Sequence, residues 1–468
     1  MHNSKLLLVY QSFTDKERAL FKKWVQSPVH NKHKDVTQLF VFMASKKRLT
    51  PRTFQKKLLF QAIYPQKPYD DLRLRHILSL GVQLLENFVC FIEQKEDSFL
   101  QQKSLIRYYT NRNLEKFAVQ HIQKAKQNQE QQIVQNSTFY YKEYELESIL
   151  LESNEKHKRV QIPNIQNITD SYTIAFIIEQ LKMACSALAY QNLNRKNHCN
   201  FLFLEHILAL LKTGEYQDII AIQFYYYSYL ALAHPNESSY FLQLKTLLLE
   251  EATVLPPQEI KQIHIIAFNF CIKQLNTGNE TYVQEVFELF QYGLEQAILI
   301  ENNLLSRFTY KNIITAALRL KKTTWTARFI QHYTPYLEPI YQKSYQHFAQ
   351  AKLLFTKGAY QQTIQLLHQV EFDDLFLNID AKVMLLKIYY EEDTTTVLDA
   401  FLNSFYIYLQ RKEIMGYHQE NYKNLVKFTR KLADTPKFDH LGLQKIKQQI
   451  EQTKPLTERA WLLEQIQK

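Results

Sequence analysis

Residues 70–96 read DDLRLRHILSLGVQLLENFVCFIEQKE. Apolar side chains recur at intervals of seven in two series: Ile77, Leu84, Phe91, and Leu78, Leu85, Ile92. Such a stripe lies along one face of an α-helix, and Asp70 or Asp71 can cap its first turn. The stretch therefore predicts one helix on the order of 40 Å long, with Gly81 on the buried seam, where a second helix can approach closely.

Glycine is scarce along the whole chain. The 468 residues contain only seven glycines, and the closest two lie fifteen positions apart. Hairpins and doubly wound folds use glycine in turns and close approaches, and no stretch alternates apolar and polar residues well enough to predict a strand. Apolar residues make up 46% of the chain, which is enough for a sizeable core. We expect an all-α protein without β-strands.

Local signals place several helices before residue 70. Residues 14–17 form a capping box that predicts a helix ending at Ser27-Pro28. A second helix is expected over residues 35–45. Thr50-Pro51 predicts a third, with proline in its first turn, ending near Tyr64. From about residue 99 the pattern becomes one helix pair after another, interrupted by a polar connector over residues 154–170.

Positive charge is concentrated at the N-terminal end. Residues 1–80 contain sixteen Lys/Arg and five Asp/Glu, whereas the other 388 residues contain 41 of each. The entire net charge of +11 therefore belongs to the N-terminal segment. Such asymmetry suggests an acidic partner, which can be nucleic acid, an acidic protein face or an anionic membrane surface. The alternative is ordinary solvation, in which cations such as Lys46-Lys47-Arg48 stabilise a helix C-terminus.

Residues 345–409 carry the clearest repeat pattern. Ala351 and Leu354 lie on a first helix, Gly358-Ala359-Tyr360 forms a turn, and Ile364, Leu367 and Val370 lie on a second helix. The Gly-x-Tyr turn recurs at residues 214–216 and, more loosely, at 278–282. This region resembles a divergent tetratricopeptide repeat. The resemblance implies a right-handed α-solenoid whose groove binds a protein or peptide partner.

A second resemblance concerns residues 50–89. A helix ending at Tyr64-Pro65, a short linker and a new helix from residue 70 resemble the last two helices of the DNA-binding domain in bacterial activators that join a winged helix to such repeats. The resemblance implies that the second helix enters the major groove. Six residues would then contact nucleic acid or another acidic partner: Arg73, His76 and Ser79 on that helix, and Arg52, Lys56 and Lys57 near phosphates. The alternative is an ordinary basic helical domain.

Several kinds of chemistry are excluded or not expected. The glycines are too dispersed for a phosphate-binding loop, a dinucleotide fingerprint or a Gly-x-Ser-x-Gly elbow. Cys185, His198, Cys199 and His206 match no usual zinc spacing. We therefore expect no catalytic site, cofactor or metal. The four scattered cysteines favour free thiols and a cytoplasmic location, and the longest uncharged stretch, residues 219–233, is too short to span a membrane.

These observations predict two domains and two alternative functions. A basic helical head is expected over residues 1–98 and a tetratricopeptide-like α-solenoid over 99–468, with a sub-boundary near 154–170. The first function is a non-enzymatic protein–protein interaction scaffold with a basic N-terminal module. The alternative is a nucleic-acid-binding transcriptional regulator. The oligomeric state and the identity of the partner stay open.

Overall fold

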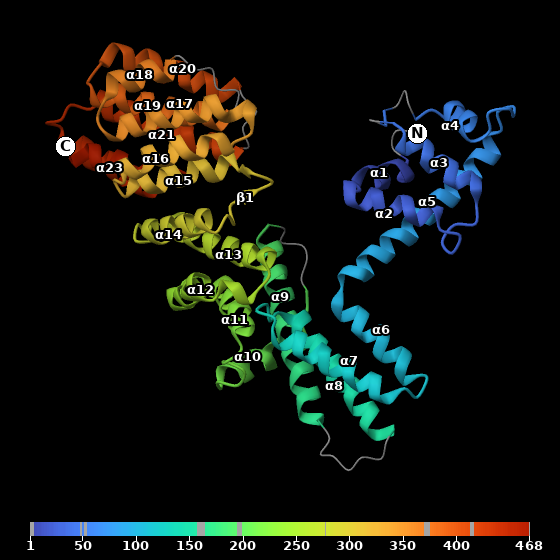
Figure 1. The fold of residues 1–468 in the computed structure, drawn as a ribbon. Helices are drawn as coiled ribbons and strands as arrows, with labels where there is room; N and C mark the ends of the chain where they lie inside the picture. The colour runs from blue at the N-terminus through green and yellow to red at the C-terminus, as the bar shows by residue number, and fades with distance from the viewer. Residues whose placement is uncertain are drawn as a thin grey trace. The chain divides into compact units, whose positions relative to one another are not determined.

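The computed structural model is predominantly helical, as the sequence predicts (Figure 1). It describes residues 4–46, 49–50, 54–156, 164–193, 199–276, 278–368, 375–411 and 416–467. These residues form 23 α-helices, two short 3₁₀ helices and one two-stranded β-ladder. The prediction of an all-α protein is therefore confirmed at the level of fold class.

The helices follow one another in chain order with short turns between most of them. The first eight are α1 (Lys5–Ser12), α2 (Asp15–Gln26), α3 (Lys34–Ala44), α4 (Lys56–Ile63), α5 (Asp71–Glu96), α6 (Ser98–Thr110), α7 (Glu115–Glu130) and α8 (Ser137–Lys156). The next eight are α9 (Ile165–Leu193), α10 (Leu204–Lys212), α11 (Ile220–Ala233), α12 (Ser238–Glu250), α13 (Pro257–Asn276), α14 (Tyr282–Glu295), α15 (Arg307–Arg319) and α16 (Thr323–Tyr333). The last seven are α17 (Pro339–Thr356), α18 (Tyr360–His368), α19 (Leu375–Glu391), α20 (Thr395–Arg411), α21 (Gly416–Asp434), α22 (His440–Gln452) and α23 (Arg459–Gln467).

Helices α1 to α5 enclose a core of their own. Phe21 lies at its centre, with ring centroids 4.8 Å from Phe40 and 5.0 Å from Phe88. The seam of α5 faces this core, and a Cβ at Gly81 would lie 2.9 Å from Leu6 Cδ1. The close approach predicted at Gly81 is confirmed. At the end of the seam Ile92 is partly buried against the core, while Phe91 is 37% exposed with its ring centroid 4.7 Å from that of Trp24.

The start of α4 differs from the prediction. Pro51 lies outside the described residues, but Phe54 is not helical and Gln55 is an extended N-cap, so the regular helix begins at Lys56. Phe54 is only 2% exposed and belongs to the core around Phe21. The Phe54 backbone N–H nevertheless donates to the Thr50 carbonyl at 2.9 Å, and the proline start itself falls on residues 51–53, outside the described part of the chain. The capping box at Thr14 and the cap at Asp70 both form as predicted.

Four left-handed turns with the same hydrogen-bond pattern follow helices of the second unit. Gly278, Lys321, Gly358 and Asp393 all have positive φ, and they follow one another after 43, 37 and 35 residues. At each of them the next backbone N–H donates to a carbonyl five residues earlier, as Ala359 does to Leu354 at 3.0 Å. This hydrogen bond satisfies a carbonyl at the helix end. Only two of these four turns contain glycine, so the sequence pattern revealed half of them.

One short β-hairpin contradicts the expectation of no strands. Ile300–Glu301 (β1) pairs with Leu304–Leu305 (β2) in an antiparallel ladder. Asn302 and Asn303 between them both have positive φ, as a two-residue type I′ turn requires. Asparagine adopts this conformation more readily than most residues, and two residues per strand are too few to show alternation.

The chain divides into two compact units. The first contains residues 1–133 and 138–175, and the second contains residues 134–137 and 176–468. The predicted head, residues 1–98, belongs to the first unit, and its boundary remains a prediction. Two stretches, α5 and residues 165–190 of α9, are long and apolar enough to cross a membrane by length and composition, a test that core helices of soluble proteins also pass. The expectations of no membrane and a cytoplasmic location remain predictions.

Candidate functional site

Two of the predicted contact residues on α4 and α5, Lys56 and Arg73, pair with acids of the same chain. Lys56 donates to Asp71 at 2.8 Å, and Asp71 also pairs with Arg75 at 2.6 Å. Hydrogen bonds from Lys56 and Tyr69 lower the pKa of the Asp71 carboxyl to about 2. Lys56 is therefore neutralised locally, although its side chain is still 40% exposed.

Arg73 is held in a similar way. Its guanidinium lies 3.9 Å from the Asp35 carboxylate and 4.3 Å from the centre of the Tyr64 ring. Tyr64 also donates a hydrogen bond to Asp35. Burial and the bond to Asp35 raise the pKa of Tyr64, which keeps the phenol protonated. Arg73 thus joins α3 to α5 and the end of α4.

The other predicted contact residues lie in open positions or outside the described residues. His76 and Ser79 are exposed on the same side of α5 as Arg73, at three-residue intervals. Lys57 is exposed on α4. Arg52 falls outside the described residues. The structure therefore leaves Lys57, His76 and Ser79 accessible, while Lys56 and Arg73 serve internal contacts.

A groove of about 860 Å³ lies elsewhere on the head, between α1, α2, α3 and the segment Leu49–Thr50. Its apolar lining includes Phe21, Val25, Phe40, Val41 and Met43. Its charged lining residues are Arg18, Lys22 and Lys46, and no described lining residue is acidic. The guanidinium of Arg18 donates to the Gln11 carbonyl at 3.1 Å, and the Lys46 ammonium lies 4.9 Å from the Phe42 ring.

The composition of this groove suits an amphipathic ligand. Apolar side chains can enter between the helices, while carboxylates can pair with Lys22 and Lys46; Arg18 already lies 3.7 Å from the Asp15 carboxylate. Pockets of roughly 300–1,000 Å³ hold a drug-sized molecule, so the groove can accept a short segment of a protein and not a whole domain. The sequence alone does not reveal this groove, because its residues come from three helices and their spacing forms no motif.

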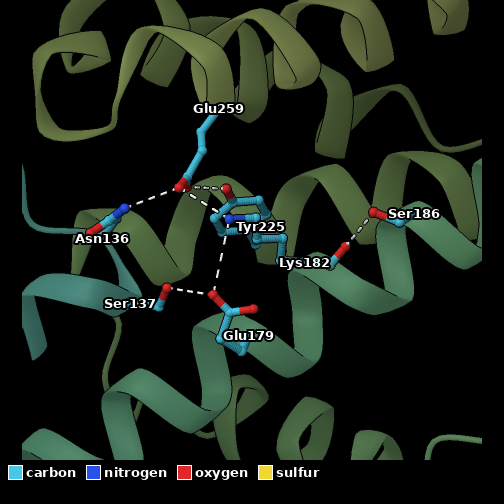
Figure 2. Close-up of polar contacts among 7 residues, drawn as sticks. All are labelled: Asn136, Ser137, Glu179, Lys182, Ser186, Tyr225 and Glu259. Carbon is cyan, nitrogen blue, oxygen red and sulfur yellow. Dashed lines mark hydrogen bonds and ion pairs between the residues drawn. The ribbon is translucent and has the colours of Figure 1, made fainter. Parts of the chain in front are cut away.

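A polar cluster lies inside the second unit (Figure 2). Glu259 on α13 accepts hydrogen bonds from Asn136 at 3.0 Å, from Lys182 on α9 at 3.1 Å and from the Tyr225 hydroxyl on α11. Burial and the bond to Glu259 raise the pKa of Tyr225 well above its usual range. The carboxylate thus has three donors, which is the condition for placing a charge inside a protein.

The same cluster fixes a short connecting segment. Ser137 donates to Glu179 on α9, and the Gln135 backbone N–H donates to the Val254 carbonyl at 2.8 Å. Gln135, Asn136 and Ser137 of this segment therefore each make a polar contact with the rest of the second unit. We assign the cluster a structural role, because each of its polar groups already has a partner in the protein.

Three partly buried ion pairs in the second unit span similar sequence distances, whereas Lys245 pairs with Glu285 only 40 residues away. Lys182–Glu259 spans 77 residues, Lys311–Asp380 spans 69 and Lys387–Glu458 spans 71. Lys311 on α15 meets Asp380 on α19 at 2.7 Å, and Lys387 on α19 meets Glu458 at 2.6 Å. One sequence signal points to these lysines: Lys387 lies between Leu386 and Ile388 inside an apolar run, where a charged residue is rarely buried without a partner.

The remaining sequence-based candidates give no assembled site. No group of three His, Cys, Asp or Glu side chains in the described part of the chain is placed to hold a metal. Cys185 is buried on α9 and Cys199 is exposed, while His198 is outside the described residues. Two aromatic runs, residues 139–141 and 224–227, begin with buried rings, but Tyr141 is 48% exposed and Tyr226 and Tyr227 are only partly buried.

Comparisons with known proteins add no relative. No protein-family model, no curated protein and no solved structure matches this chain.

Proposed function

We propose that this chain is a non-enzymatic protein-interaction scaffold whose basic head binds an acidic, partly apolar segment of a partner protein. The observation that carries the proposal is the groove between α1, α2 and α3, with its apolar lining, its three cations and no acid among the described lining residues. A partner segment with carboxylates beside Leu or Phe side chains complements both features. The net charge of residues 1–80 would also speed the encounter with an acidic partner.

We further propose that the helices of the second unit form a tetratricopeptide-like, right-handed α-solenoid with a peptide-binding groove. Support comes from the left-handed turns at intervals of 43, 37 and 35 residues and from ion pairs spanning 69 to 77 residues. One helix pair of this family occupies about 34 residues, so the ion pairs span about two pairs. We place this scaffold in the cytoplasm, without a cofactor.

A binding experiment on the full chain tests the head. The probe is a fluorescein-labelled synthetic helix with Leu and Glu on opposite faces, and a peptide of the same composition in scrambled order is its control. The double variant Lys22→Glu, Lys46→Glu should weaken binding of the ordered peptide by at least about tenfold, since close charge pairs contribute upwards of 1.5 kcal/mol. Lys57→Glu is the matched control, a lysine of the head outside the groove. Equal loss in both variants would contradict the proposed site.

A nucleic-acid-binding regulator is the second candidate, favoured by the accessible Lys57, His76 and Ser79 on α4 and α5. Labelled duplex DNA in the same assay separates the two functions. For a regulator, the logarithm of the DNA-binding constant should fall with the logarithm of the salt concentration, with a slope of about −0.9 per phosphate contact. Lys57→Glu should weaken DNA binding more than the double variant Lys22→Glu, Lys46→Glu does. Absence of DNA binding at low salt would end this candidate.

A further inference from the structure

A second groove, which we call the α21 groove, lies in the second unit. It has a volume of about 430 Å³ and is lined by Tyr406 of α20 and by one face of α21. Four of its lining residues are cations that recur at helical spacing, Lys423, Lys427, Arg430 and Lys431. The other face of α21 is buried in the core through Leu425, Phe428 and Leu432. Packing of that face therefore holds the four cations in a row along the groove.

The charges of this row are not neutralised by ion pairs. Within the part of the chain that the structure describes, none of the four cations pairs with a carboxylate. Arg430 donates to the neutral side chain of Asn403 and Lys431 to that of Gln449, both at 2.6 Å. Lys427 is exposed and has no polar partner among the described residues. These cations are therefore available to an anion that enters the groove.

The remaining lining residues leave the α21 groove positive and polar. Two acids, Glu420 and Asp434, stand against the four cations, so the lining has a net charge of +2. Among the described lining residues, only Val426 and the Tyr406 ring offer apolar surface. Charge, and not burial of apolar groups, therefore selects the ligand.

Other lysines between helices of the second unit are engaged by the protein itself. Lys245 on α12 pairs with Glu285 on α14 at 2.6 Å. Lys352 on α17 donates to the Thr315 hydroxyl on α15 at 2.8 Å, and burial lowers the pKa of this lysine to about 8. The cations of α21 differ from both, because they line a groove that a solute can enter.

We propose that the α21 groove binds a molecule that carries two or more phosphate groups, either soluble or in a lipid headgroup. Lysine and arginine pair well with phosphate oxygens, and arginine can donate to two of them at once. The row from Lys423 to Lys431 covers about two helical turns, on the order of 12 Å, which is longer than one phosphate. The volume suits a small ligand, since such sites occupy roughly 300–1,000 Å³. This site is independent of the head groove.

Binding assays on the full chain at physiological ionic strength test the class of ligand. Inorganic triphosphate is titrated by calorimetry, with a glutamate oligomer of matched charge as its control. Vesicles of phosphatidylcholine, with or without phosphatidylinositol bisphosphate, are tested by co-sedimentation. We expect at least one phosphate probe to bind more tightly than the glutamate oligomer, and the better probe identifies a soluble or a lipid source. Equal binding of the glutamate oligomer would overturn the proposal.

Two double variants locate the binding. Lys423→Gln, Lys427→Gln should weaken binding of the phosphate probe at least about tenfold, because two charge-assisted contacts are lost. Lys445→Gln, Lys447→Gln removes the same charge from exposed positions of α22 outside the groove, and should bind as the wild type does. An equal loss of affinity in the two variants would mean that only the total charge matters, and would contradict the site.

Acetylation of lysines, followed by mass spectrometry, separates this site from the basic head. The bound phosphate probe should slow acetylation of Lys427 several-fold and leave that of Lys445 unchanged, because the probe covers only the groove. The same spectra report on Lys22 and Lys46 in the head. Protection of the head lysines without protection of Lys427 would place the phosphate in the head and overturn the α21 site.

Discussion

The head and the second unit use lysine in opposite ways. In the head, the Lys5–Glu86 pair leaves its partners 65% and 48% exposed, and Lys22 borders an open groove. In the second unit, the side chains of Lys182 and Glu259 are only 22% and 12% exposed, and the pair reaches from α9 to α13. Exposed pairs contribute little because water screens them, whereas a buried pair is costly to break. The same residue type is therefore largely exposed in one region, where we propose that it binds a partner, and joins helices in the other.

The largest effect should come from breaking a buried pair. Glu259→Ala leaves Lys182 and the Tyr225 hydroxyl without their acceptor, and should lower the unfolding free energy of the second unit by about 3–5 kcal/mol. Urea unfolding followed by tryptophan fluorescence measures it in a Trp24→Phe background, where the remaining tryptophans, Trp325 and Trp461, both lie in the second unit. A decrease in unfolding free energy below about 1 kcal/mol would mean that this pair contributes no more than an exposed ion pair does.

A smaller effect is expected from crowding the core of the head. Gly81→Ala places a methyl group 2.9 Å from Leu6 Cδ1 and 3.1 Å from Leu39 Cδ2, so those side chains must shift. Overpacking of this kind costs about 1–3 kcal/mol. Unfolding followed through Trp24, in a chain with Trp325 and Trp461 replaced by Phe, reports on the head. Unchanged stability would mean that both leucines move aside without cost.

Alkaline pH should distinguish Lys352 from the exposed lysines. Its pKa is about 8 in the folded chain and about 10.4 when unfolded. Between these values the unfolded state binds more protons, so this residue makes stability rise with pH from about 8 to 10. Buried tyrosines such as Tyr225, whose pKa is raised, oppose this trend above about pH 10. The stability difference between wild type and Lys352→Met should therefore be measured at pH 7 to 10, and a constant difference would contradict the shift.

The smallest effect is expected at the surface of the head. Lys5→Ala removes a pair whose partners are both mostly in water, and should cost less than about 1 kcal/mol and less still at high salt. The Trp24 measurement used for Gly81→Ala detects it. A salt-independent decrease in unfolding free energy above about 2 kcal/mol would mean that Lys5 contributes through packing. The lysines of the head and of the second unit would then differ less in their effect on stability.

Local signals predicted much of the helical structure. The capping box at Thr14 and the cap at Asp70 each act within a few residues, and both form. The turns after the repeat helices are harder to predict, because Lys321 and Asp393 adopt the left-handed conformation that is typical of glycine. Such positions are set by packing of the flanking helices, which no short window contains.

The candidate sites were predictable only in their charge. The excess of lysine in residues 1–80 pointed to the head, but the acid that neutralises Arg73 is Asp35, 38 positions earlier in the chain. Likewise, nothing near Lys352 in the sequence indicates that Thr315 meets its ammonium while the acids pair with other lysines. Tertiary contacts decide which cations can still bind a partner, and a count of charged residues does not contain those contacts.

The cysteine thiols also provide positions for fluorescent labelling of this protein. Cys90 and Cys199 are exposed, whereas Cys185 and Cys271 are buried, and burial raises the pKa of Cys185 to about 12 and that of Cys271 further. Maleimide dyes react with thiolates, so brief labelling at neutral pH should mark the two exposed positions and spare the core. One dye would then reside in each unit of the wild-type chain. Single-molecule energy transfer between the two dyes would report whether a ligand of one unit alters the distance between the labelled positions.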